Sequence, residues 1–372
     1  MSDSDRLWLF KSYSDEQDLK AVTDVIERGT WWANGPEIAE FEAQIAEWTN
    51  REYAVAVNSG TTALYAMLCA HGVTDGEVIV PSFTFPATAN AVVAAGATPV
   101  FADIERDSLA LDVESVRDTV TDDTRAVMPI HFGGDIARDI RALREFCRDR
   151  SLFLFEDACH SLGATFDGDR VGSFGDAASF SFCFNKIITT GEGGMVVTDS
   201  PEIHRELKRF RSHGRNEDKE YVSYGHNFRL SSLSAALGVS QAEKLGYIIE
   251  RRRAMASYLN DCLDDIGPLM LPQFPSERNS VYQLYNIRFE TPQIQDRLAA
   301  FLDQRGIPTR VTYDPVHLTD YYRTEWGYER GDLPVTESVS ETIITLPFHL
   351  GLDENDLDRI CSAVREFFED ER

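Results

Sequence analysis

One lysine of this chain stands where an amine could do chemistry. Lys186 follows an aromatic segment at 179–184 and precedes a glycine-rich turn at 191–194. Such an apolar setting lowers the pKa of an amine and leaves it free to attack a carbonyl carbon, as a Schiff-base lysine must. The alternative is a surface lysine whose stem covers apolar residues while its ammonium reaches water. Lysine is otherwise confined to Lys11, Lys20, Lys208, Lys219 and Lys244.

A carboxylate follows a very apolar stretch of the chain. Asp157 closes the run 152–157, which is typical of a buried strand. In open α/β sheets, ligands bind at the carboxyl ends of the strands. A protonated pyridine nitrogen that donates a hydrogen bond to this carboxylate would stay cationic and act as an electron sink. The alternative is that Asp157 caps the turn that follows it.

A third candidate combines a strand end, a glycine and two hydroxyls. The residues Asn58 to Thr62 stand where a helix is expected to begin. The first N–H groups of a helix are unpaired and lie at its positive dipole end, so this segment could bind a phosphate. Serine and threonine also cap helices for structural reasons alone, which is the alternative interpretation.

These residues need a scaffold, and the pattern from 53 to 199 predicts one. Short apolar runs alternate with amphipathic stretches such as 61–72 and 137–150, which is typical of an α/β fold with a mostly parallel sheet flanked by helices. The expected seven strands are 54–58, 77–81, 98–104, 125–130, 152–157, 178–182 and 194–199.

The second half of the chain predicts a smaller unit. Single cores stop growing at roughly 250–300 residues, so 372 residues favour two domains. A helical run at 231–263 is expected to lead into an α+β domain that contains a strand at 285–290 and helices at 295–306 and 353–371. We therefore expect a large domain at 1–245, including an N-terminal arm, and a small domain at 246–372.

Composition limits the possible partners and location. The net charge of −26 should repel nucleic acid and anionic membranes, so we expect neither as a partner. We find no apolar run able to span a membrane and no secretory signal, and we expect a cytoplasmic protein. The cysteines are scattered without metal-ligand spacing, so we expect neither a metal site nor disulfides. An acidic, lysine-poor surface also suggests a halophilic protein.

Several motifs in one order resemble a known family. They are Asn58 to Thr61, Pro81 to Phe85, Glu156 to Ala158, Ser181 with Lys186 five residues later, and Gly191 to Gly194. Together they resemble the DegT/DnrJ/EryC1/StrS aminotransferases, and the similarity runs from about Gly29 to the C-terminus. This resemblance implies a fold-type I enzyme that depends on pyridoxal 5′-phosphate (PLP). Most members of the family aminate keto sugars attached to nucleotides.

The resemblance also implies a role for individual residues. Lys186 would hold the cofactor as a Schiff base and carry protons, and Asp157 would pair with the pyridine nitrogen. The phosphate would be bound by Gly60, Thr61 and Ser181. Phe85 would stack on the pyridine ring, and His160 would lie near the phenolic oxygen. Asn227 would reach the phosphate of a neighbouring subunit, which implies a homodimer with shared active sites.

The resemblance defines the substrates less closely than it defines the cofactor site. Glutamate is the implied amino donor. The segment 185–194 looks more like members that aminate C4 of a nucleotide-linked 4-keto-6-deoxyhexose, such as perosamine synthases. A cyclitol aminotransferase acting on scyllo-inosose and a non-catalytic PLP-binding regulator are the alternatives. Gln283 departs from the family, since relatives often have histidine there. Candidate contacts to an anionic substrate at the pocket mouth are Arg211, His213, Arg215 and Arg229, which could equally be solvated surface charges.

Overall fold

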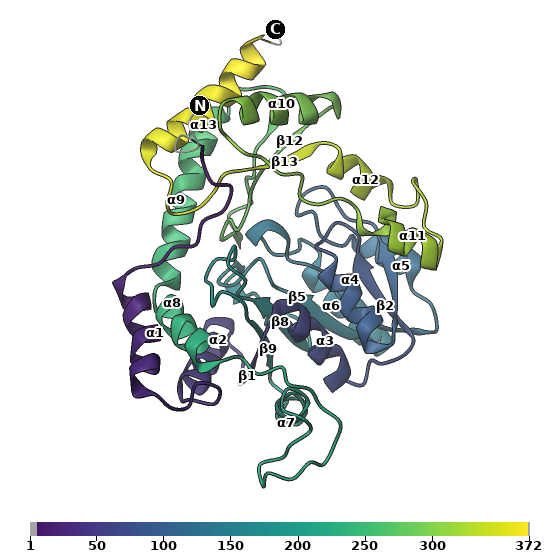
Figure 1. The fold of residues 1–372 in the computed structure, drawn as a ribbon. Helices are drawn as coiled ribbons and strands as arrows, with labels where there is room; N and C mark the ends of the chain where they lie inside the picture. The colour runs from purple at the N-terminus through teal and green to yellow at the C-terminus, as the bar shows by residue number, and fades with distance from the viewer. Residues whose placement is uncertain (1–5, 371–372) are drawn as a thin grey trace.

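A mostly parallel sheet forms the centre of the larger part of the molecule (Figure 1). The computed structural model describes residues 6–370. The sheet has seven strands in the order β1-β9-β8-β5-β4-β2-β3, and β9 runs antiparallel to both neighbours. Its strands are β1 (Tyr53–Val57), β2 (Glu77–Pro81), β3 (Thr98–Ala102), β4 (Thr124–Val127), β5 (Phe153–Asp157), β8 (Ala177–Ser181) and β9 (Gly194–Thr198).

Helices cover both faces of this sheet. Along β1, Ala54 and Ala56 belong to one apolar core while Val55 and Val57 belong to another, as the alternation of a strand requires. The first core is closed by α2 (Glu37–Thr49), α5 (Val113–Thr119), α6 (Ile140–Arg150) and α8 (Ser232–Glu243). The second is closed by α3 (Gly60–Ala70), α4 (Ala87–Ala95) and α7 (Pro201–Phe210). Continuous apolar strands such as β2 are explained by this double coverage.

The expected helical run at 231–263 is helical but is interrupted. It forms α8 and α9 (Leu245–Leu263), which meet at Lys244. The Lys244 ammonium lies 2.7 Å from Asp15 and 2.8 Å from Asp18, at the start of α1 (Glu16–Arg28). The junction between the two helices therefore fastens the N-terminal arm to the larger part of the molecule.

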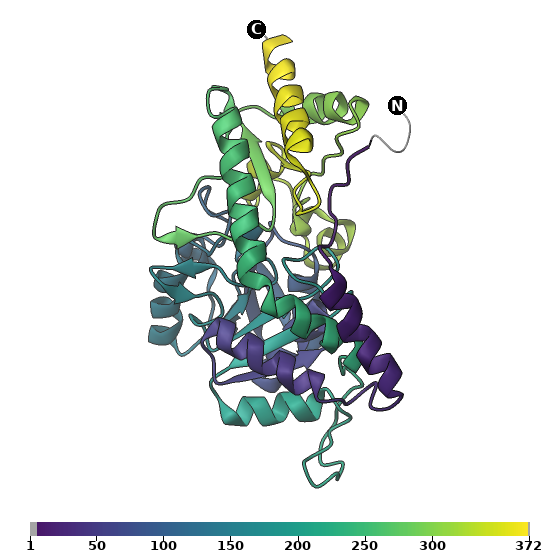
Figure 2. The same ribbon diagram turned by 90° about the vertical axis from the view of Figure 1, so that its left-hand side faces the viewer.

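The C-terminal part has a core of its own. A three-stranded sheet of β10 (Leu269–Met270), β12 (Tyr285–Phe289) and β13 (Ile343–Leu346) packs with α9, α10 (Gln293–Gln304) and α13 (Glu354–Asp370), as Figure 2 shows. Val316 and Tyr322, however, join the core beneath α3 and α4. The segment that carries them thus returns to the large sheet. The division at 245/246 stays a prediction.

The remaining elements are short. They are the 3-10 helices Phe132–Gly134 and Val316–Leu318, the helices α11 (Asp320–Trp326) and α12 (Pro334–Ser340), and the small sheet of β6 (Thr165–Phe166), β7 (Asp169–Arg170) and β11 (Arg278–Asn279). None of the helices within 6–370 has the length and apolar character needed to cross a membrane. The cysteines, all within this range, are free thiols.

Candidate active site

A cavity of about 340 Å³ opens at the carboxyl edge of the large sheet. The strands β1, β2, β5 and β8 are mutually parallel and end at this edge, so the residues that follow them converge there. The cavity brings together the predicted residues Gly60, Thr61, Phe85, Asp157, His160, Ser181 and Lys186. Residues from separate segments of the sequence therefore share one site.

Lys186 lies in a tight loop between β8 and β9. Its backbone N–H donates to the Cys183 carbonyl at 3.0 Å, and the Phe182 N–H donates to the Gly193 carbonyl at 2.9 Å. The loop needs glycine at Gly194, where a Cβ would lie 2.2 Å from the Ser59 carbonyl oxygen. Burial lowers the pKa of the Lys186 ammonium below its usual range. The neutral, nucleophilic amine is therefore more populated at Lys186 than at an ordinary lysine.

Asp157 is buried at the end of β5 and is one of the residues that line the cavity. One carboxylate oxygen accepts a 2.7 Å hydrogen bond from the Thr88 hydroxyl, and the other accepts a 3.2 Å bond from the Cys159 N–H. A carboxylate can accept about four hydrogen bonds, so acceptor capacity remains for a donor in the cavity. Asp157 is thus held in place and still able to bind a ligand.

The start of α3 forms another wall of the cavity. Ser59 caps the helix by accepting a hydrogen bond from the Thr62 N–H at 3.1 Å. The earlier N–H groups of the helix, at Gly60 and Thr61, have no acceptor within it. A Cβ on Gly60 would lie 2.7 Å from the Ser181 Cβ, so α3 and the end of β8 approach closely. This arrangement suits a phosphate group.

Aromatic and imidazole rings line the rest of the cavity. Phe85 is half exposed, and its ring lies 6.0 Å from that of Tyr313. The Tyr313 hydroxyl lies 3.3 Å from His160 Nε2, while His160 Nδ1 accepts a 3.4 Å bond from the Gly133 N–H. Burial lowers the pKa of His160 well below its usual range, and the Lys186 charge lowers it further. His160 is therefore neutral at pH 7.

The cavity also contains residues that sequence reasoning missed. Arg310 and Tyr313 come from the irregular segment between α10 and α11, where no strand or helix pattern marks them. Gln283 was recognised as a departure from the family, and its amide donates to the Asn185 carbonyl at 2.5 Å, next to Lys186. Gln283 thus supports the lysine loop from the C-terminal part of the chain.

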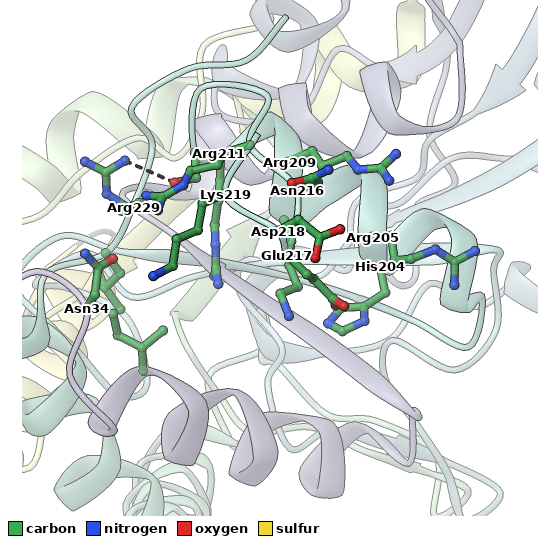
Figure 3. A pocket seen from close by; sticks show the side chains of 15 residues that line it. Asn34, His204, Arg205, Arg209, Arg211, Asn216, Glu217, Asp218, Lys219 and Arg229 are labelled. Carbon is green, nitrogen blue, oxygen red and sulfur yellow. Dashed lines mark hydrogen bonds between the residues drawn. The ribbon is translucent and has the colours of Figure 1, made fainter. Parts of the chain in front are cut away.

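The predicted substrate arginines lie elsewhere in the subunit. Arg211, Arg215 and Arg229 line a separate cavity of about 540 Å³, beside α7 (Figure 3). Arg211 donates to the Ala56 carbonyl at 2.7 Å and pairs with Glu42. The structure does not bring these arginines or His213 to the Lys186 cavity of the same subunit, where they were expected at its mouth. Asn227 is also absent from this cavity, and its contact with the phosphate of a neighbouring subunit stays a prediction.

The residues of the Lys186 cavity fit PLP. Lys186 supplies the amine for its aldehyde, the buried Asp157 an acceptor for its pyridine nitrogen, and the start of α3 donors for its phosphate. Gly60 leaves free the space that a larger residue would fill. The fold and this set of groups define a PLP-dependent enzyme.

Comparison with known proteins identifies the family. The chain belongs to the DegT/DnrJ/EryC1/StrS aminotransferase family, whose model matches residues 12–365. The GDP-perosamine synthase of Vibrio cholerae is 36% identical to this chain, and the match covers 95% of this chain and 97% of that protein. The predicted family, the enzyme class and the cofactor are thereby confirmed.

Solved structures agree with this assignment. Helicobacter pylori PseC, an aminotransferase of pseudoaminic acid biosynthesis, has a TM-score of 0.92 and 29% identity, covering 98% of this chain and 100% of its own. DesV of S. venezuelae, solved with a ketimine intermediate, has a TM-score of 0.89 and 35% identity, covering 95% and 94%. The predicted α/β fold with a mostly parallel seven-stranded sheet is therefore confirmed.

Proposed function

We propose that this enzyme moves an amino group from glutamate to C4 of a nucleotide-linked 4-keto-6-deoxyhexose. The observation that carries the aminotransferase chemistry is the convergence of Lys186, Asp157 and the start of α3 on one cavity. The acceptor is inferred from the segment 185–194 and from the similarity to a GDP-perosamine synthase. The chain is thus placed among enzymes that build amino sugars.

Each residue of the cavity has a task in this proposal. PLP, when bound, supplies an electron sink for the carbon that carries the amine. Lys186 anchors the cofactor at rest, and its freed amine then removes the proton from the α carbon of glutamate. In the second half-reaction the same amine gives a proton to the sugar carbon that receives nitrogen. Its lowered pKa suits it to both tasks.

The other predicted residues hold the cofactor in place. Asp157 would keep the pyridine nitrogen protonated, and neutral His160, with Tyr313 beside it, would face the phenolic oxygen. Phe85 would cover one face of the pyridine ring. Gly60, Thr61 and Ser181 bind the phosphate. The resemblance to the family implies these roles, and the presence of all these residues in one cavity supports them.

We also propose a homodimer with shared active sites. Asn227 is exposed and lies on the loop between α7 and α8, which protrudes from the large sheet next to α7 (Figure 1). Two strongly exposed tyrosines, Tyr221 and Tyr224, lie on the same segment. In a dimer this segment would carry Asn227 and the neighbouring arginines toward the partner's cofactor and substrate.

The function is tested by separating the two half-reactions. Glutamate added to the purified yellow protein should convert its absorbance to that of the aminated cofactor. A GDP-linked 4-keto-6-deoxyhexose should then restore the original spectrum, whereas scyllo-inosose should not. Steady-state kinetics should give parallel double-reciprocal lines, because the two substrates share one site. Restoration by scyllo-inosose alone would indicate a cyclitol aminotransferase, and no spectral change with glutamate would indicate a regulator.

A further inference from the structure

One cation of the Lys186 cavity has no role in the proposed amino transfer. Arg310 lines this cavity, and the other cationic or imidazole side chains that line it are Lys186 and the neutral His160. The acidic side chains that face the cavity are engaged with other groups. Asp157 accepts from Thr88, and Glu192 lies 3.4 Å from the Cys183 thiol. The Arg310 guanidinium is therefore left for a ligand.

Arg310 has no acidic partner within the described part of the chain, although the chain is rich in carboxylates. The sequence holds 62 aspartates and glutamates against 36 lysines and arginines. Among residues 6–370, no ion pair or side-chain hydrogen bond holds Arg310, whereas Arg141 binds Asp167 and Asp169. Its contact is with a ring, since the guanidinium carbon lies 5.6 Å from the centre of Tyr313. A free arginine at a cavity is poised for an anion.

The backbone of Arg310 is nevertheless fixed. Its N–H donates to the Thr345 carbonyl at 3.2 Å, and the Thr345 N–H donates back to the Arg310 carbonyl at 2.8 Å. Thr345 is fully buried in β13, where its hydroxyl also bonds Asn286 and Thr312. The guanidinium thus extends from a rigid base, so less ordering is needed when it binds a ligand.

Arg310 lies on the reactive side of the cavity. It contacts Tyr313, which touches His160, and its charge contributes to the lowered pKa of Lys186. The residues proposed to bind the cofactor phosphate lie at the start of α3 and at Ser181, whereas Arg310 lies on the segment between α10 and α11. An anion held by Arg310 is therefore close to the carbon from which Lys186 would remove a proton.

We propose that Arg310 binds the α-carboxylate of the amino donor. This carboxylate is attached to the same carbon as the amine, whereas the diphosphate of a sugar nucleotide is separated from C4 by the hexose ring. A guanidinium can bind a carboxylate through two parallel hydrogen bonds. The inference rests on the proposed use of glutamate, and it makes Arg310 a residue that selects the donor.

The test compares donors that differ in one charge. The rate of the first half-reaction is followed by cofactor absorbance with glutamate, with its α-amide isoglutamine and with its γ-amide glutamine. Wild-type enzyme should prefer glutamate over isoglutamine by about 10- to 100-fold in the second-order rate constant. Arg310→Gln should lose this preference, Arg310→Lys should retain part of it, and the preference of glutamate over glutamine should be unchanged.

A control variant and a binding measurement complete the test. Arg251→Gln, an exposed arginine of α9 outside both cavities, is the matched control and should behave as wild type. Affinity for glutarate, a non-reactive dicarboxylate, should fall at least about tenfold in Arg310→Gln. Unchanged glutarate affinity, or an unchanged preference for glutamate over isoglutamine, overturns the proposal.

The two half-reactions also separate this inference from the proposed function. A variant that is impaired only when the keto sugar restores the spectrum would place Arg310 at the acceptor's phosphate, which contradicts the proposal. A wild-type protein that does not react with glutamate would contradict the proposed donor instead. Glutarate binding then still decides whether Arg310 holds a carboxylate.

Discussion

Lys186 differs from the other lysines in what surrounds its amine. Its side chain faces a cavity that it shares with Asp157, Cys159 and His160. Burial lowers its pKa, while the pKa of Lys20 is raised by a hydrogen bond from Lys20 to Asp24. The same side-chain type is therefore a nucleophile at one position and a solvated cation at the other.

This contrast predicts the order of chemical labelling. Reductive methylation requires a neutral amine, and a lowered pKa means that the neutral form appears at lower pH. In the cofactor-free protein near pH 9, Lys186 should be methylated faster than Lys20, although Lys20 is more exposed. Mass spectrometry of the peptides measures both rates. Faster labelling of Lys20 would contradict the assigned environment of Lys186.

Sequence reasoning at this scale succeeded where residues stand directly at strand ends. Asp157 ends β5, and the strand pattern alone placed it at the carboxyl edge of the sheet. Ser181 ends β8, and the resemblance to the family singled it out. Tyr313 could not be placed in this way, because it lies 153 residues from His160 in an irregular segment. Its contact depends on the return of the C-terminal part to the large sheet, which no local pattern records.

The elements that build the site are three strand ends and one helix start. The sequence predicted each strand of the sheet to within a few residues, because strands buried on both faces are uninterrupted apolar runs. The break between α8 and α9 was missed. At this break Lys244 pairs with Asp15 and Asp18, which lie more than two hundred residues away. Such distant pairs leave no periodic signal.

The close approach of α3 to β8 predicts the effect of a single methyl group. Gly60→Ala would place a Cβ 2.7 Å from that of Ser181, so these elements must separate. We expect weaker PLP binding and a loss of about 1–3 kcal/mol in the free energy of unfolding. Titration with PLP and denaturant unfolding measure the two effects.

A second glycine provides the control. At Gly246, in the first turn of α9, the nearest atom to an added Cβ is Trp48 Cη2 at 4.0 Å. Gly246→Ala should change the free energy of unfolding by less than about 1 kcal/mol and leave PLP affinity unchanged. Equal effects of the two substitutions would refute the close packing of α3 against β8.

The whole molecule carries far more negative than positive charge. The positive side chains that line the cavity beside α7 are an exception to this surface, and they belong to the segment that we propose to meet a partner subunit. Composition predicted the charge but not its distribution, since the cations come from α7 and from the segment after it. The dependence of stability on salt tests the effect of the net charge, and subunit exchange tests the proposed contact between subunits.

Salt should stabilise the protein. The net charge of −26 produces self-repulsion in the folded state, and the screening length falls from roughly 30 Å at 0.01 M salt to roughly 3 Å at 1 M. The midpoint of thermal unfolding should therefore rise with KCl concentration. Sucrose at matched osmolality is the control for non-ionic effects. Full stability in dilute buffer would count against adaptation to high salt.

Shared active sites predict complementation between two inactive variants. A Lys186→Ala subunit retains Asn227, and an Asn227→Ala subunit retains Lys186. After subunit exchange in equal amounts, half of the dimers should be mixed and each should hold one intact site. Activity should then recover to about one quarter of the wild-type value if each parent homodimer is inactive. No recovery in proven mixed dimers would refute the sharing of Asn227.

The central claim is that Lys186 is both the anchor of PLP and the proton carrier of both half-reactions. The most direct measurement is the absorbance and turnover of Lys186→Ala after loading with PLP. We predict a cofactor that is held non-covalently, is removed by dialysis and cannot be fixed to the chain by borohydride, together with loss of amination. Amination near the wild-type rate, or borohydride fixation of PLP within this cavity of the variant, would contradict the account.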